Sequence, residues 1–305
     1  MSNVGTVGTV GTVGTIGTIG HHRHRTLVPA VAAPWLRAVL DGPVREARVL
    51  TATPAAVYAR VLGAPPTVVG VLARGAVAVS CGLRTQLDTV PTNVDVVHLG
   101  HGCLAIGSHE VHVMRLVDPV VPVLGVLDPD ATAWLAARLA TGDDLGTCEA
   151  RSVLPVGVLE SMSADGPAAV RHLLGLGPGL TPLGDDVLAA WLVARRATGR
   201  DDAGVGAAVL RCADEATTPL SATLLRCAVD GQAVPPVRDL LLALRTGGHL
   251  DAALSRLLAV GHTSGAGLAL GVSAALQPGT ATGSNDSESA DAPEPAHPQT
   301  RTGCP

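Results

Sequence analysis

Residues Gly175–Asp186, GLGPGLTPLGDD, lie directly before an apolar run that is typical of a helix. The segment holds four glycines and two prolines, and it ends in two adjacent carboxylates. Glycine lets a backbone adopt positive φ or approach a ligand closely, whereas proline fixes φ. A helix start adds free N–H groups and the positive end of the helix dipole. The pattern therefore indicates an anion-binding loop, with Gly177, Gly179, Thr181 and Gly184 as its contacts.

The acidic pair Asp185 and Asp186 has two interpretations, which stay open at this point. As capping carboxylates, they would belong to a tight connection between two helices. As functional groups, they are candidate catalytic residues, and one of them would orient an arginine or hold a divalent cation, Mg²⁺, that bridges the anion. Adjacent carboxylates at a helix start cannot both face one ligand, so we expect one of them to reach the site. The pair alone does not predict a resident metal ion or another cofactor.

The sequence before the glycine-rich loop separates it from nucleotide-binding loops. Rossmann and P-loop glycine turns follow a strand. Here the preceding segment, AAVRHLLG at 168–175, is typical of a helix, and the strict G-x-G-x-x-G spacing is absent. The chain also contains no lysine, which a P-loop requires. Both nucleotide interpretations are therefore excluded.

A second glycine-rich segment, Gly261–Gly271 (GHTSGAGLALG), also precedes a helix. His262 stands beside two hydroxyls and is a candidate general acid–base or anion donor. Thr263 and Ser264 are candidate anion contacts, and the alternative is that Ser264 only caps the helix. Two such segments in one helical region favour a shared site for a small anionic metabolite.

Three polar residues outside these segments are further candidates for the anion site. Thr217 and Ser221 lie at the start of an expected helix, where hydroxyls are also favoured as caps. Arg171 precedes the main loop, and an arginine can pair bidentately with phosphate or carboxylate. Its alternative is a solvated position on a helix face. Because the chain has no lysine, every fixed cation at such a site is an arginine.

Composition narrows the class of protein. The net charge of −5 and the aromatic content of 1% argue against a nucleic-acid partner. Apolar runs are broken before about 18 residues, which argues against a membrane span. The six cysteines show no C-x-x-C spacing, and no export signal is recognisable. We therefore expect a soluble, cytoplasmic protein with reduced thiols.

The hydrophobic pattern of the sequence changes near residue 150, from strand-like to helical. Residues 26–150 hold short valine-rich runs and predict a β-rich domain, whereas residues 151–276 carry helical periodicity. The predicted fold class is therefore α+β: a β-rich N-terminal domain followed by a mainly α-helical C-terminal domain. Residues 1–25, with a VGT/IGT repeat, and the polar residues 277–305 are expected to be disordered. Expected strands are 67–71, 76–81, 95–99, 104–106 and 111–117; expected helices are 54–62, 130–142, 167–174, 186–198, 207–216, 220–229, 237–245, 250–260 and 265–276.

Histidines of the β-rich half have the residue types of a zinc site. They form the patterns His98-x-x-His101-x-Cys103 and His109-x-x-His112. In a strand, however, residues i and i+3 point to opposite faces. Gly-Ser at 107–108 resembles a hairpin turn, which would pair the two later histidines with neighbouring strands. No metal site is predicted here.

Three segments together resemble one family. They are GLGPGLTPLGDD, TTPLSATLLRCAVDGQAVPPV from Thr217, and VGHTSGAGLALG from Val260. They are similar to the AllH-type family, whose named member is a subunit of bacterial oxamate carbamoyltransferase. The similarity to the family is strong over 171–272. It is weaker over 50–150, where the family shares a strand-rich composition and the segment DPVVP at 118–122. Many members of this family carry no assigned function.

The resemblance implies carbamoyl transfer in allantoin-derived nitrogen catabolism, with oxalurate and phosphate exchanging with oxamate and carbamoyl phosphate. It also implies further carbamoyltransferase subunits as partners. The alternatives are a subunit that binds a metabolite or serves as a scaffold without catalysis, and an enzyme for a different carbamoyl or amide substrate. Two departures from the family involve three positions: Leu183 replaces the serine of TPSGDD, and Ala266 and Gly267 replace an aromatic and a polar residue.

Overall fold

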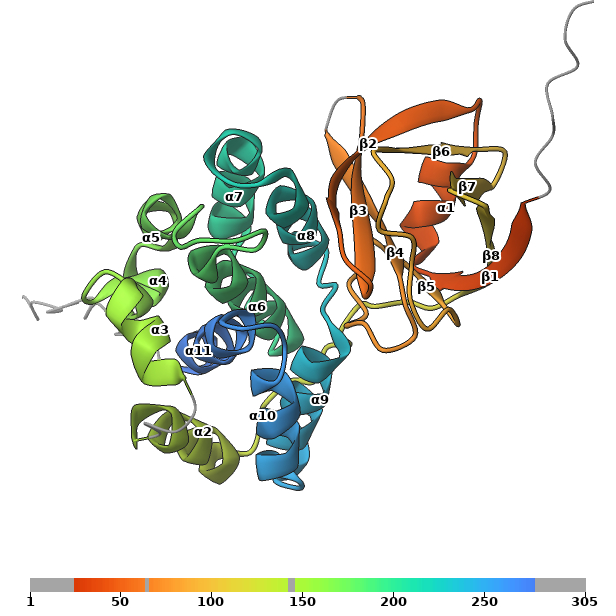
Figure 1. The fold of residues 1–305 in the computed structure, drawn as a ribbon. Helices are drawn as coiled ribbons and strands as arrows, with labels where there is room; N and C mark the ends of the chain where they lie inside the picture. The colour runs from red at the N-terminus through yellow and green to blue at the C-terminus, as the bar shows by residue number, and fades with distance from the viewer. Residues whose placement is uncertain (1–24, 64–65, 142–145, 278–305) are drawn as a thin grey trace, which may run out of the picture.

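The computed structural model describes residues 25–63, 66–141 and 146–277. These residues form two parts that lie side by side, a β-barrel and a group of helices (Figure 1). The two segments expected to be disordered, 1–25 and 277–305, lie outside the described residues except for Arg25 and Gln277.

The N-terminal part is a closed barrel of eight strands, and this corrects the predicted fold class, which named only a β-rich domain. The strand order is β1-β5-β4-β3-β2-β6-β7-β8, and the barrel closes where β1 pairs in parallel with β8. The pair β4–β5 is also parallel, whereas the other neighbours are antiparallel. The strands are β1 Thr26–Ala32, β2 Arg45–Ala52, β3 Ala56–Val61, β4 Thr67–Leu72, β5 Gly82–Thr85, β6 Val96–Gly100, β7 Cys103–Ile106 and β8 His109–Leu116.

Two local expectations in this half are wrong. The expected helix 54–62 is strand β3, because Val57, Ala59 and Val61 bury alternate side chains and the strand pairs with both β2 and β4. The expected strand 76–81 is a loop. Since β4 and β5 are parallel neighbours, the chain needs a crossover between them, and this segment supplies it.

The barrel core is aliphatic and includes one short helix. Helix α1 (Pro34–Leu40) contributes Leu36 and Leu40, which are almost fully buried among the inward residues of the strands. Across the β7–β8 hairpin, Leu104 and Val111 lie opposite each other and point into this core. The residues on either side of them therefore face outward.

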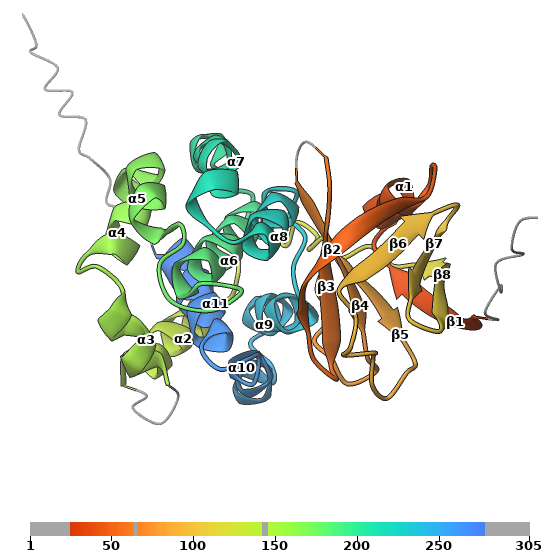
Figure 2. The ribbon, with the colours of Figure 1, turned by 45° about the horizontal axis from the view of Figure 1, so that its top comes forward.

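The C-terminal part is a bundle of ten helices among the described residues, built around α6 and α11 (Figures 1 and 2). Almost every residue of α11 is buried, as expected for a central helix. Gly271 lets α11 approach α6 closely, because a Cβ there would lie 2.2 Å from the Val187 carbonyl oxygen. The helices are α2 Pro129–Thr141, α3 Thr147–Val153, α4 Val158–Ala164, α5 Gly166–Leu173, α6 Leu183–Ala197, α7 Ala203–Ala216, α8 Pro219–Val229, α9 Pro235–Thr246, α10 Leu250–Leu258 and α11 Ser264–Leu276.

Helix α8 joins the two parts. The Thr223 hydroxyl accepts a hydrogen bond from the Val68 N–H of β4 at 3.1 Å, and Arg226 donates to the Pro66 carbonyl. Leu220 packs in a small apolar cluster with Val68 and Cys81 of the barrel. Helix α8 is thus held against the barrel wall. None of the described helices combines the length and the apolar character that a membrane-spanning segment needs.

Candidate functional site

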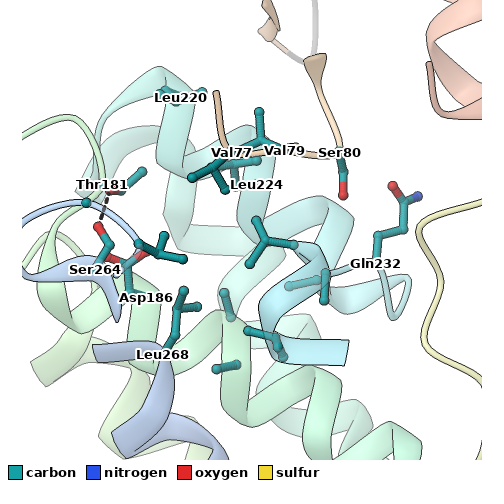
Figure 3. A pocket seen from close by; sticks show the side chains of 18 of the residues that line it. Val77, Val79, Ser80, Thr181, Asp186, Leu220, Leu224, Gln232, Ser264 and Leu268 are labelled. Atoms are coloured by element: carbon teal, nitrogen blue, oxygen red, sulfur yellow. Dashed lines mark hydrogen bonds between the residues drawn. The ribbon is translucent and has the colours of Figure 1, made fainter. Parts of the chain in front are cut away.

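A cavity of about 260 Å³ lies where the helical part meets the barrel. Its walls come from α6, α8, α9 and α11 on one side, and from Tyr58 of β3 and the loop 77–80 on the other. Most of the side chains that line it are aliphatic (Figure 3). A site of this size, apolar walls and few polar groups is typical of a small-molecule pocket.

The polar groups of the cavity lie at two ends. Thr181, Asp186 and Ser264 form one end, and Ser80 and Gln232 lie at the other (Figure 3). The Thr181 and Ser264 hydroxyls are hydrogen-bonded to each other at 3.0 Å. Ser264 is the first residue of α11 and not its N-cap. Its hydroxyl therefore does not cap the helix and is available for the contact with Thr181.

Two of these polar side chains keep unused hydrogen-bonding capacity. Asp186 Oδ2 and Gln232 Oε1 are buried, and no partner within the described residues reaches either oxygen. A buried polar atom without a partner costs about 1–3 kcal/mol. Such atoms in the lining of a cavity therefore favour a ligand that satisfies them.

Asp186 is held in an environment that favours its neutral form. Burial raises the pKa of its carboxyl well above the usual range, and the neighbouring charge of Asp185 raises it further. A hydrogen bond from Ser264 acts in the opposite direction, but burial is the largest cause. A neutral carboxyl offers one donor and one acceptor, which is the pattern that complements a primary amide.

Asp185 points to the other side of the first turn of α6. Its Oδ1 accepts from the Gly175 N–H at 2.8 Å, and its Oδ2 accepts from the Ser221 hydroxyl at 2.6 Å and from the Thr217 hydroxyl. Burial raises the pKa of Asp185 as well, although these three hydrogen bonds lower it. The carboxyl, 1% exposed, ties the glycine loop to the start of α8. Asp185, Thr217 and Ser221 therefore form a bracing network, and none of the three lines the cavity.

The N–H groups at the start of α6 are largely used by the protein itself. Gly184 donates to the Leu176 carbonyl at 2.9 Å, and Asp185 and Asp186 both donate to the Pro182 carbonyl. Gly184 also allows a close contact, since a Cβ there would lie 2.0 Å from the Leu173 carbonyl oxygen. The first turn of α6 therefore has few free N–H groups that could bind an anion.

The exposed part of the loop differs, because its backbone N–H groups are free. No acceptor among the described residues takes the N–H of Gly177, Gly179, Leu180 or Thr181. Gly177 and Gly179 have φ of 106° and 101°, a conformation that favours glycine. Leu180 and Thr181 also line the cavity. The donors for an anion or a carbonyl oxygen thus lie at the edge of the cavity.

Three further predicted residues, like those of the bracing network, are outside the cavity lining. His262 is exposed, and Thr263 is the N-cap residue of α11 without a side-chain capping bond. Arg171 is exposed on α5. The cavity lining holds no arginine, histidine or lysine among the described residues.

Sequence reasoning missed the second polar end and the barrel wall. Ser80 and Tyr58 come from the β-rich half, and Gln232 lies in the turn after α8. Ser80 and Tyr58 stand in no recognisable motif, and nothing in the segment from Thr217 that resembles the family marks Gln232 as a site residue. They reach the site only because α8 docks on β3 and β4, which local patterns do not reveal.

The two departures from the family pattern are in contact. A Cβ on Gly267 would lie 2.9 Å from Leu183 Cδ1 and 3.0 Å from Asp186 Cβ. Leu183 thus occupies space that a side chain at position 267 would require. Both residues lie beside the polar end of the cavity that contains Asp186.

Comparison with known families supports the resemblance seen in the sequence. Residues 173–276 match the family model described as oxamate carbamoyltransferase subunit AllH. The match begins at the last residue of α5 and ends at the last residue of α11, so it contains the glycine loop, Asp185, Asp186 and Ser264. The barrel lies outside it. No solved structure matches the chain.

Proposed function

We propose that this chain is a carbamoyltransferase subunit that binds the carbamoyl group of its substrate in the cavity between barrel and helices. The observation that carries this proposal is Asp186: a buried carboxyl with an unpartnered oxygen in an apolar cavity, where burial raises its pKa. The match of residues 173–276 supplies the class of reaction. The proposed exchange converts oxalurate and phosphate into oxamate and carbamoyl phosphate.

Asp186 would recognise the carbamoyl group through two hydrogen bonds. Its hydroxyl would donate to the carbamoyl carbonyl, and its other oxygen would accept from the carbamoyl NH₂. In the reaction a phosphate oxygen attacks the carbamoyl carbon, the bond from that carbon to the oxamate nitrogen breaks, and this nitrogen takes a proton. The free N–H groups at 177–181 would stabilise charge that develops on oxygen.

The charge of the site explains why a partner subunit is needed. Oxalurate and phosphate are both anions, whereas the cavity lining holds one carboxyl and no cation among the described residues. Anionic groups of this kind are usually held by arginine or by a metal ion. We therefore place the cationic contacts for carboxylate and phosphate on other subunits, which close over the loop.

The test is the phosphate-dependent cleavage of oxalurate by the purified complex. We expect Asp186→Ala to lower kcat/KM by about 100-fold, because a methyl group offers neither the donor nor the acceptor. Asp88→Ala, on the barrel surface beside Arg74, is the matched control for loss of a carboxyl side chain. Full activity of the Asp186→Ala complex would exclude the proposed role.

A second candidate function is favoured by the aliphatic walls: binding of a neutral, partly apolar amide without chemistry. Thermal denaturation of the isolated chain with hexanamide or with oxamate distinguishes the two. Stabilisation by hexanamide that requires Asp186, combined with a complex whose activity does not, would support the second candidate. An active complex that requires Asp186 supports the first.

A further inference from the structure

A second group of chemically active side chains lies on the outer face of the β7–β8 hairpin, far in sequence from the glycine loop. Cys103 lies directly opposite His112 in the antiparallel register. Glu110 is two residues before His112 on β8, so both side chains are on the same face. The residues between them, Leu104 and Val111, point into the barrel. The three polar side chains therefore share the outer face.

These side chains already converge on one point. Sγ of Cys103, a carboxylate oxygen of Glu110 and a ring nitrogen of His112 all lie within 4.8 Å of one another. His112 Nε2 is 2.7 Å from Glu110 Oε1, and the Cys103 thiol donates to the Gly100 carbonyl oxygen at 3.3 Å. Within the part of the chain that the structure describes, this is the only cluster of at least three potential metal ligands.

The donor set is one that a borderline divalent cation prefers. Thiolate, imidazole and carboxylate are the ligands of zinc, at about 2.0–2.3 Å from the metal. Tetrahedral geometry then places ligand atoms about 3.3–3.8 Å apart, so small side-chain rotations from the present positions are sufficient. Backbone pairing of β7 with β8 already holds Cys103 opposite His112, so little conformational entropy is lost when the two side chains bind a metal ion.

We propose that Cys103, Glu110 and His112 bind Zn²⁺, with the fourth coordination position open to water or an external ligand. The Glu110 and His112 side chains are 36% and 31% exposed, so this position faces solvent. Three protein ligands with one open position is the arrangement of zinc sites that carry out chemistry, whereas structural sites have four protein ligands. This site is independent of the cavity and of the proposed carbamoyl transfer.

The other histidines of the sequence pattern are excluded from the site. His98 lies beside Glu46, at 3.6 Å, and His101 sits in the turn between β6 and β7 with φ of 52°. The group in the structure therefore differs from the sequence pattern, because it joins Cys103 and His112 with Glu110, which the pattern did not include. Cross-strand pairing, not spacing along the chain, brings Cys103 to His112.

The positive charge of Arg25 should weaken Zn²⁺ binding by repulsion. Arg25 lies close enough to both Cys103 and Glu110 for its charge to influence them. Removing the guanidinium should therefore increase the affinity for Zn²⁺. The variant Arg25→Ala therefore offers a gain of affinity as a test, which simple damage to the fold does not produce.

The experiment uses the full chain, reduced, in a background where His21, His22 and His24 are replaced by Asn to remove competing imidazoles. Titration with Co²⁺ should give one equivalent of a complex with a thiolate-to-cobalt charge-transfer band, and Zn²⁺ should displace it. Cys103→Ser should abolish the band, and His112→Asn should weaken binding by at least about 10-fold. Arg25→Ala should strengthen it.

Cys148→Ser removes an exposed free thiol elsewhere and is the matched control. The band should be unchanged in this variant. Absence of the band in the background protein, or its persistence after Cys103→Ser, would overturn the proposal. Circular dichroism of each variant checks that the barrel is intact, so that loss of binding reports on the ligands.

Discussion

The two sides of the first turn of α6 carry the same residue type but differ in every other respect. On the side that faces α8, Asp185 accepts three hydrogen bonds and is fully enclosed. On the side that faces α11, Asp186 lines a cavity and keeps one oxygen without a partner in the described structure. The neighbours, not the residue, decide the role. One carboxyl supports the loop, and we propose that the other binds a ligand.

Loss of Asp185, on the side of α6 that faces α8, should lower the stability of the protein most. Asp185→Ala leaves the Gly175 N–H and two hydroxyls without their acceptor, so we expect a loss of about 3 kcal/mol or more in unfolding free energy. Asp186→Ala removes a carboxyl that is already poorly satisfied, and we expect a cost below about 1 kcal/mol. Urea denaturation of both variants measures the difference. Equal costs would show that the two sides are energetically alike.

The split between the two carboxyls illustrates what sequence could and could not predict. The glycines, the acidic pair and the hydroxyls at 217, 221 and 264 marked this region, and one of the two carboxylates was expected to reach the site. Which one was not predictable, because it depends on whether α8 or α11 packs against each side. The same applies to the barrel. Alternation marked several strands, but closure depends on β1 pairing with β8 across the whole domain.

The helix expected at 54–62 shows a further limit of local patterns. Alanine and valine occur in both helices and strands in this chain, so the segment carries little information of its own. Its pairing with β2 and β4 on both sides decides the outcome. Helices α6 to α11 were easier to predict, because their apolar stripes are longer and their ends carry glycine, proline or hydroxyl residues.

Asp186 should also make the unfolding free energy depend on pH. Burial raises the pKa of Asp186 well above its usual value of 3.8, so above about pH 4 the folded chain holds a proton that the unfolded chain releases. Raising the pH from about 4 towards the folded pKa therefore lowers the unfolding free energy, by about 1.4 kcal/mol for each unit between the two pKa values. Above the folded pKa the loss is complete. Asp186→Asn should remove most of this decline.

Urea denaturation of the wild type and Asp186→Asn from pH 4 upwards measures this effect. Asp185 contributes with the same sign, but its three hydrogen bonds reduce its share. Asp88→Asn should retain the decline, since this residue is exposed on the barrel. A stability difference between wild type and Asp186→Asn that does not change with pH would mean that Asp186 is not buried as described.

The smallest expected effect concerns Leu183 and Gly267, which touch beside Asp186. Gly267→Ala places a methyl 2.9 Å from Leu183 Cδ1, so it should destabilise the protein by about 1–3 kcal/mol. In a Leu183→Ser background part of this cost should vanish, giving a coupling of about 1 kcal/mol in a double-mutant cycle. The relief is only partial, because the Leu183 carbonyl oxygen is also 3.0 Å from the new methyl.

Gly271→Ala is the matched control for this cycle. Its methyl would meet the Val187 carbonyl at 2.2 Å, on the same α6–α11 interface but away from Leu183, so its cost should not change in the Leu183→Ser background. Coupling at 267 without coupling at 271 would show that Leu183 and the residue at position 267 interact directly. Additive costs at both positions would mean that Leu183 does not restrict the space at position 267.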